Sequence, residues 1–255
     1  MKKTIYIWAI GLALPLLLGG CNSKNAAKNT GNEDSTAVAA VSDPSIDDET
    51  LGQKQEEGIW EHFAQWTSTP LTTEAKDGKV TIYDFARTFC NEYSGFEPCE
   101  QLLSYLKDPK GYDSKKTNFY VRDAPKNGYI QCFWDWEFAN TVTLCYWNRK
   151  NGHLLVGATV ERGFEADEDC KYQYMFYDYD KANGQMTPDL EIKKAFDTFG
   201  AKFRHMYACL PEEGKDCYVS TWTKGNDDES EDDNTFKEYQ AKWDGMTFTF
   251  GPSDR

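Results

Sequence analysis

The chain is poor in the residue patterns that carry enzyme chemistry. It contains no Gly-x-Ser-x-Gly, no His-Glu-x-x-His, no phosphate-binding glycine loop and no dinucleotide fingerprint. Its only histidines, His62, His153 and His205, are dispersed, and no Cys-x-x-Cys occurs, whereas zinc sites need closer ligand spacing. We therefore expect a protein that is not an enzyme and that holds no metal or cofactor.

Positive charge is also scarce. Lysine and arginine number 28 against 42 aspartate and glutamate residues, which gives a formal net charge of −14. Such a potential repels nucleic acid and anionic lipid, so binding to polyanions is not expected. The acidic balance is typical of a soluble domain tethered at a surface.

The first twenty-one residues have the pattern of an export signal. Lys2 and Lys3 precede an apolar stretch that ends in Leu18-Gly19-Gly20-Cys21. These last four residues resemble the lipobox of bacterial exported lipoproteins, and the resemblance is confined to this segment. It implies cleavage before Cys21, a diacylglycerol on its sulfur and acylation of its new amino group, a two-chain anchor suited to membrane retention. The alternative is a simple secretory signal in which Cys21 is incidental.

The segment 22–55 contains no aromatic residue and is rich in Ala, Asn, Ser, Thr and Asp. It cannot bury enough apolar surface to offset the entropy of ordering, so we expect a flexible tether over 21–55 behind a signal peptide over 1–20. The expected location is the bacterial cell envelope, at the outer membrane. Whether the domain faces the periplasm or the cell exterior stays open.

Seven cysteines follow Cys21, and in an oxidising compartment such residues pair as disulfides. Cys90 and Cys99 lie between two helical patterns, Cys209 and Cys217 flank a turn, and Cys132 and Cys145 lie on successive strands. These three pairs are the predicted disulfides, which leaves Cys170 over. A direct bond between Cys132 and Cys145 needs matched register of the two strands. The alternative is a disulfide between Cys170 and one of these two cysteines.

Three segments near the start of the domain have helical spacing. Trp60, Phe63 and Ala64 favour a short helix over 56–66. Thr81 and Asp84 form a capping-box pattern ahead of an apolar face that continues to Phe89, and a further helix is predicted from Pro98 to Lys107. The stretch 190–199 fits a short helix or a loop.

From Thr117 the apolar period changes to two, which is typical of strands. Asn-Gly recurs between the strands at 127–128, 151–152 and 183–184 and favours hairpins. The first five strands are predicted over 118–122, 129–137, 141–148, 153–161 and 171–179. Two further hairpins pair 203–210 with 217–223 and 236–243 with 246–250.

These patterns predict one α+β domain over 56–255, with a helical part over 56–110 and a β part over 117–250. A helical hairpin packs on an antiparallel meander of roughly eight to ten strands.

The aromatic residues offer a possible ligand platform. Trp134, Trp136, Trp147 and Trp222 have flat faces that suit sugars, although large aromatics usually serve the core. Asp135 and Glu137 resemble the paired carboxylates of a glycosidase, but such acids normally come from separate strands, and an exposed strand face explains them better.

The acidic run 226–234 supplies oxygen ligands for calcium, but its spacing does not follow the EF-hand loop, so we interpret it as a solvated connection. The expected function is that of a lipid-anchored, non-enzymatic interaction module for a protein partner. The alternative is a module that binds a carbohydrate or another small ligand through exposed aromatic residues.

Overall fold

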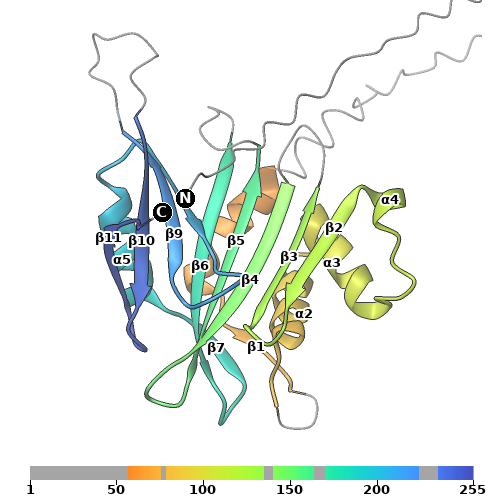
Figure 1. Ribbon diagram of the computed structural model, residues 1–255. Coiled ribbons are helices and arrows are strands. Elements are labelled where there is room, and N and C mark those ends of the chain that lie inside the picture. Colours follow the sequence, from red (N-terminus) through yellow and green to blue (C-terminus); the bar gives the residue numbers. More distant parts are fainter. Residues whose placement is uncertain (1–56, 76–78, 135–139, 164–169, 224–234, 255) are drawn as a thin grey trace, which may run out of the picture. The chain divides into compact units, whose positions relative to one another are not determined.

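The computed structural model describes residues 57–75, 79–134, 140–163, 170–223 and 235–254 (Figure 1). Three sets of predictions lie outside these residues. They are the signal peptide and tether over 1–55, the site candidates Asp135, Trp136 and Glu137, and the acidic run 226–234. Over the described ranges, the predicted α+β class, with helices packed on an antiparallel meander, is confirmed.

The helical hairpin comes first in the chain. A helical segment at 57–64 leads into the short helix η1 (Trp66–Ser68), and α2 (Ile82–Glu92) and α3 (Glu97–Lys107) follow. Helix α2 begins where the sequence predicts, because the backbone N–H of Thr81 donates to the Asp84 carboxylate at 2.9 Å. Two more helices are α4 (Ser114–Thr117) and α5 (Leu190–Gly200), so the stretch 190–199 is helical.

Seven strands form sheet A, in the order β1-β7-β6-β5-β4-β3-β2, with every neighbouring pair antiparallel. The chain runs through six of them in succession, and β1 closes the far edge against β7. The bounds are β1 (Leu71–Thr72), β2 (Phe119–Ala124), β3 (Tyr129–Trp134), β4 (Asn140–Asn148), β5 (Leu154–Arg162), β6 (Lys171–Asp180) and β7 (Gln185–Pro188).

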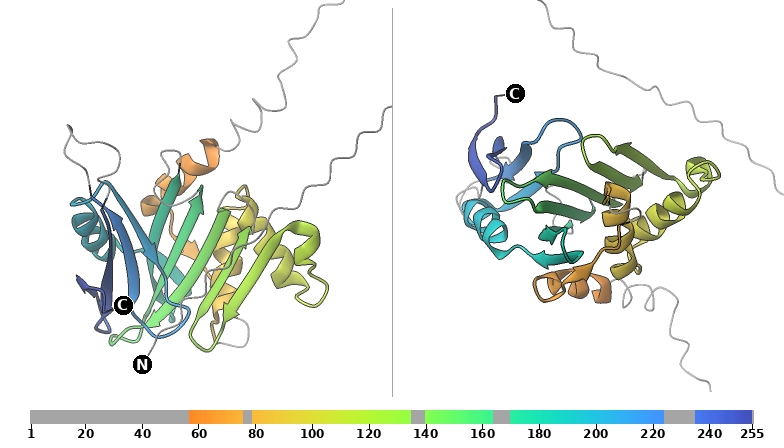
Figure 2. Two further views of the ribbon diagram at one scale, coloured as in Figure 1. Left: turned by 45° about the horizontal axis from the view of Figure 1, so that its top comes forward. Right: turned by 90° about the horizontal axis from the view of Figure 1, so that it is seen from below.

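Four later strands form sheet B, in the order β11-β10-β9-β8, again antiparallel. Their bounds are β8 (His205–Cys209), β9 (Cys217–Trp222), β10 (Phe236–Trp243) and β11 (Phe248–Pro252). The helical hairpin covers one face of sheet A, and sheet B with α5 lies on the other side (Figures 1 and 2).

Two hydrophobic cores result, one on each face of sheet A. Alternation along β5 divides its side chains between them: Leu154 and Val156 join the core under the helices, and Leu155 joins the core between sheet A and sheet B. Phe196 of α5 lies in the second core, with ring centroids 4.8 Å from Phe176 and 5.5 Å from Phe248. Sheet A is thus buried on both faces near its centre.

The Asn-Gly sites do lie in hairpin loops, but the loops are longer than two residues. The loop residues between paired strand ends number four at 125–128 and 181–184, and five at 149–153. Within them Gly128, Gly152 and Gly184 have positive φ and the preceding asparagines do not. A longer loop needs only one left-handed residue, and glycine supplies it without a steric penalty.

The disulfide predictions are wrong for this structure. Cys132 pairs with Val142 across β3 and β4, while Cys145 pairs with Tyr129. The two side chains therefore leave opposite faces of sheet A, Cys132 toward the helices and Cys145 toward sheet B. A bond between them would have to cross the sheet.

The other two predicted bonds are also not formed. Cys209 pairs with Tyr218, one position from Cys217, so Cys209 is exposed on the outer face of sheet B while Cys217 is a buried free thiol. Cys90 and Cys99 are buried between α2 and α3 as free thiols in hydrogen-bond contact. The helices are held together by apolar packing and by this thiol contact.

Candidate functional site

The predicted tryptophan platform is not gathered in one place. Trp134 is half-buried on the helix side of sheet A, where its ring stacks on Phe119 at 6.3 Å. Trp147 is 3% exposed in the core between the sheets, and its indole N–H donates to the carbonyl of Lys215 at 2.7 Å. Trp222 lies half-buried on the outer face of sheet B. Among these three, Trp147 serves packing.

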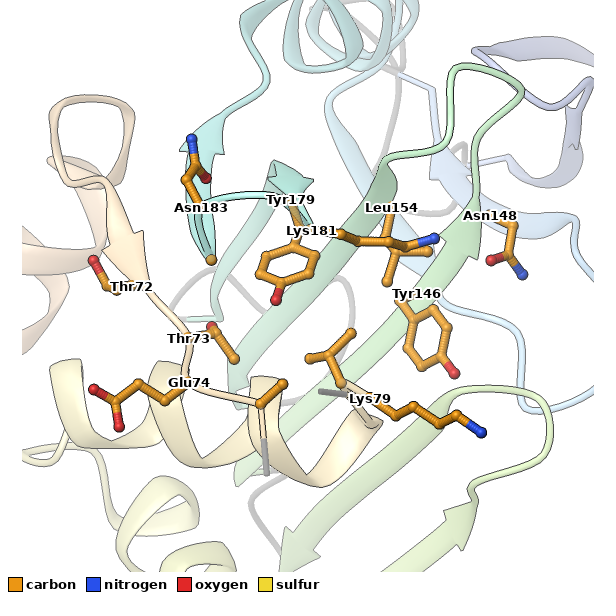
Figure 3. A pocket seen from close by; sticks show the side chains of 13 residues that line it. Thr72, Thr73, Glu74, Lys79, Tyr146, Asn148, Leu154, Tyr179, Lys181 and Asn183 are labelled. Carbon is orange, nitrogen blue, oxygen red and sulfur yellow. The ribbon is translucent and has the colours of Figure 1, made fainter. Parts of the chain in front are cut away.

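A cavity of about 860 Å³ opens instead on the helix side of sheet A, beside the β4–β5 and β6–β7 loops (Figure 3). It is lined by the ends of β4, β5 and β6, by β1 with the segment after it, and by the residues just before α2. We call it the tyrosine–lysine cavity after Tyr146, Tyr179, Lys79 and Lys181, which line it together with Asn148.

Helix α2 positions the two tyrosines. The ring of Phe85, fully buried, makes edge contacts with Tyr179 at 4.9 Å and with Tyr146 at 5.6 Å. Edge-to-face contacts of this kind fix ring orientation as well as burying area. Leu154, 2% exposed, lies opposite Tyr179 across β5 and β6 and completes the apolar lining.

Gly128 explains why the Tyr146 ring can lie where it does. A Cβ built on Gly128 would stand 2.7 Å from a ring carbon of Tyr146, a separation that real Cβ atoms do not show. The same glycine has a φ of +71° in the β2–β3 loop. One residue therefore serves both the turn and the ring beside the cavity.

The two phenol hydroxyls are available to a ligand. Within the part of the chain that the structure describes, neither Tyr146 nor Tyr179 hydrogen-bonds through its hydroxyl to another residue. Burial raises the pKa of both side chains, and for Tyr179 the nearby carboxylates of Asp84 and Asp180 raise it further. Both phenols stay protonated at neutral pH and are ready donors.

Charge around the cavity differs from that of the whole chain. Lys79, Lys181 and Glu74 are the charged residues that line it, so the lining carries a net positive charge. The chain as a whole has a formal net charge of −14. Figure 3 shows the Glu74 carboxylate pointing away from both lysines. Neither lysine forms an ion pair with another described residue.

The two described carboxylates that act electrostatically on Tyr179 are already engaged. Asp84 accepts from the Thr81 backbone and hydroxyl and from Arg87. Asp180 accepts from the Ala182 backbone N–H at 2.8 Å. Carboxylates that already accept hydrogen bonds attract a further cation less strongly. The ammonium groups of Lys79 and Lys181 are therefore free to face a ligand.

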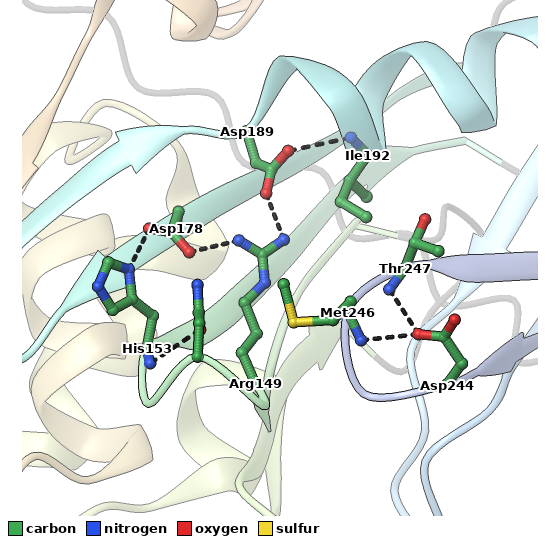
Figure 4. Close-up of polar contacts among 9 residues, drawn as sticks. Arg149, His153, Asp178, Asp189, Ile192, Asp244, Met246 and Thr247 are labelled. Carbon is green, nitrogen blue, oxygen red and sulfur yellow. Dashed lines mark hydrogen bonds and ion pairs between the residues drawn. The ribbon is translucent and has the colours of Figure 1, made fainter.

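A second polar cluster lies at the β4–β5 loop and differs in character (Figure 4). The guanidinium of Arg149 donates to Asp178 and Asp189, and His153 Nδ1 contacts Asp178 at 2.6 Å. A histidine oriented by an aspartate is part of a catalytic triad, but the second ring nitrogen of His153, Nε2, contacts Asp180 at 3.9 Å and not a hydroxyl or thiol. This cluster braces the loop.

Sequence reasoning missed the cavity because its parts come from distant segments. Alternation along β6 does place Tyr177 and Tyr179 on one face, opposite Tyr172 and Tyr174. Nothing local shows that residues 72–80 fold against that face. The Asn183-Gly184 turn, which the sequence does indicate, supplies two of the lining residues.

Among the described residues, no group of three or more His, Cys, Asp or Glu side chains is placed to hold a metal ion. The helices in these residues are all too short or too polar to cross a membrane. Comparison of the chain with protein-family models, with curated proteins and with solved structures found no match.

Proposed function

We propose that the chain is a non-enzymatic binding module of the bacterial cell envelope that holds a small, oxygen-rich ligand, a carbohydrate, in the tyrosine–lysine cavity. The observation that carries this proposal is the pair of phenol hydroxyls, of Tyr146 and Tyr179, that line a cavity and have no protein partner among the described residues. Neither hydroxyl oxygen is enclosed by protein, so both open on the cavity and can donate to the acceptor oxygens of a ligand there.

The lining suits a sugar in both of its chemical aspects. The half-buried Tyr146 ring and Val80 present apolar surface to the C–H faces of a pyranose, while the phenols and the Asn148 amide bond its hydroxyls. The volume of about 860 Å³ lies within the usual range of ligand pockets, roughly 300 to 1,000 Å³.

The anchor is part of the same proposal. Residues 18–21 support lipidation of Cys21, and the polar composition of 22–55 supports a tether that lets the module reach ligands away from the membrane. Expression of the full chain and of Cys21→Ser, followed by mass spectrometry and membrane fractionation, tests this. An unmodified Cys21 in the membrane-bound wild type would overturn the anchor.

Calorimetric titration of the full chain with neutral and acidic oligosaccharides tests the cavity. Tyr179→Phe keeps the ring and removes the hydroxyl, so we expect binding to weaken about tenfold, as for a lost hydrogen bond of about 1.4 kcal/mol. Tyr174→Phe is the matched control, because Tyr174 lies on the same strand, faces the other core and bonds Asp197. Equal losses in both variants, or no binding by the wild type, would overturn the proposal.

A protein partner, the function first expected from the sequence, remains a second proposal. Its best support is the exposed Phe236, 53% accessible, whose ring lies 5.0 Å from Trp222 on the outer face of sheet B. A photo-crosslinking residue placed at Phe236 should trap one defined protein, and the same residue at Lys242, on the same strand and face, should not. Identical products at both positions would argue against this surface.

A further inference from the structure

We infer that the tyrosine–lysine cavity selects acidic sugars, with Lys79 and Lys181 as the residues that recognise the anionic group; this inference rests on the proposed function and names its substrate class. The shared chemistry is a sugar ring that carries a carboxylate or a phosphate. Of these two we propose the carboxylate, as in a uronic acid. Phosphate-bearing compounds are included in the experiment below as competing ligands.

The first step is the supply of hydrogen-bond donors. Two ammonium groups, two phenol hydroxyls and the amide of Asn148 line one cavity. An ammonium group has donors and no acceptor, and a protonated phenol that meets an acceptor donates. A ligand that satisfies this set must be rich in acceptor oxygens, and an anionic group accepts from ammonium donors more strongly than a neutral hydroxyl does.

The second step is the local balance of charge. Glu74 points away from Lys79 and Lys181, and Asp84 and Asp180 are held by backbone and side-chain donors of their own. At an ionic strength of 0.15 M the screening length is about 8 Å. The distant acidic residues of the chain are screened at that range, whereas the lysines at the rim act on the ligand directly.

The third step concerns the rings. A free anion needs no apolar surface, yet the half-buried side chains of Tyr146 and Val80 line the cavity. Tyr179 and Leu154 also line it, but they are only 3% and 2% exposed and add little accessible surface. Apolar lining next to paired cations favours a ligand with one apolar face and one charged edge. A uronic acid residue has this division, and inorganic phosphate does not.

The experiment compares trigalacturonate with its methyl ester, which keeps the sugar skeleton and removes the charge. Both are titrated calorimetrically into the full chain at 0.15 M NaCl, beside glucose 6-phosphate and inorganic phosphate. We expect the acid to bind at least tenfold more tightly than the ester. The double variant Lys79→Gln/Lys181→Gln should lose that preference and bind the acid and the ester with similar affinity.

The matched control is Lys115→Gln/Lys116→Gln in α4, which removes the same charge from exposed positions outside the cavity. It should keep the preference for the acid. Equal binding of acid and ester by the wild type would overturn the inference and leave the proposed function standing. Binding of neither would also overturn the inference, and the proposed function falls if the neutral oligosaccharides do not bind either. Phosphate alone binding as tightly as trigalacturonate would overturn the choice of a sugar acid.

Discussion

The guanidinium of Arg149 donates a hydrogen bond to the carboxylate of Asp189, and the two side chains are only 8% and 9% exposed. Asp189 is also the N-cap of α5, where it accepts from the backbone N–H of Ile192 at 3.0 Å. Through this one carboxylate the β4–β5 loop is tied to the start of α5. Because both charged groups are buried, the loss of either one would leave the other without a partner and lower the stability of the fold.

Replacing Arg149 with methionine should therefore destabilise the protein. The change leaves the buried Asp189 carboxylate without its cation, and removing one partner of a buried pair costs about 3 to 5 kcal/mol. Urea unfolding followed by tryptophan fluorescence measures the loss. Arg122→Met is the control, because its ion pair with Glu212 is exposed and should contribute less than about 1 kcal/mol. Similar losses in the two variants would contradict this account.

Gly157 should not tolerate alanine although its strand geometry is ordinary. A Cβ there would lie 2.9 Å from a ring carbon of Trp147 and 3.1 Å from one of Phe176, both buried between the sheets. Overpacking of this kind costs about 1 to 3 kcal/mol. Thermal unfolding of Gly157→Ala should show a lowered midpoint. The strand glycine Gly251 has open space around it, so Gly251→Ala should be neutral or slightly stabilising, and the idea fails if both variants behave alike.

Stability should fall at alkaline pH because of the half-buried Tyr83 and the buried Tyr93. Burial, together with the hydrogen bond to Asp123, raises the pKa of Tyr83 from 10.0 to about 12, and burial raises that of Tyr93 to about 12. The fold favours the neutral phenol, so this contribution is complete below pH 10 and is lost as the pH rises from 10 through 12. Urea unfolding at intervals across that range measures the fall. In Tyr83→Phe the fall should be shallower, and an unchanged slope would count against the assignment.

Five buried thiols should resist alkylation in the native protein. The thiols are those of Cys90, Cys99, Cys132, Cys145 and Cys217, each at most 1% exposed. Burial raises the pKa of Cys145 to about 12 and also raises those of Cys99, Cys132 and Cys217, so the reactive thiolate is scarce at pH 8. Iodoacetamide labelling of the reduced protein, read by peptide mass spectrometry, should modify these positions only after urea is added. Labelling at equal rates with and without urea would refute the expected protection.

Features set by short-range chemistry could be predicted from the sequence. The capping contact between Thr81 and Asp84 spans three residues, so its pattern fixes the start of α2. Glycines at 128, 152 and 184 lie at or near the ends of hairpin loops because only a residue without a Cβ adopts positive φ easily. Alternation of apolar residues likewise gives the strands of the meander.

Short or distant pairings escaped prediction. Strand β1 has two residues, and it exists because Leu71 and Thr72 pair with Met186 and Gln185, more than a hundred positions away. The sequence also gives no sign that the last four strands form a separate sheet rather than extend the first.

The sequence by itself determined the α+β class, the order of the helices and most strands, and the turn positions, because these depend on periodicity and on local backbone preferences. Only the tertiary structure decided which face each cysteine takes, that Arg149 is buried between two aspartates, and that Tyr146, Tyr179, Lys79 and Lys181 surround one cavity. These features depend on register and on contacts between distant segments, and a shift of one residue in register would reverse every face.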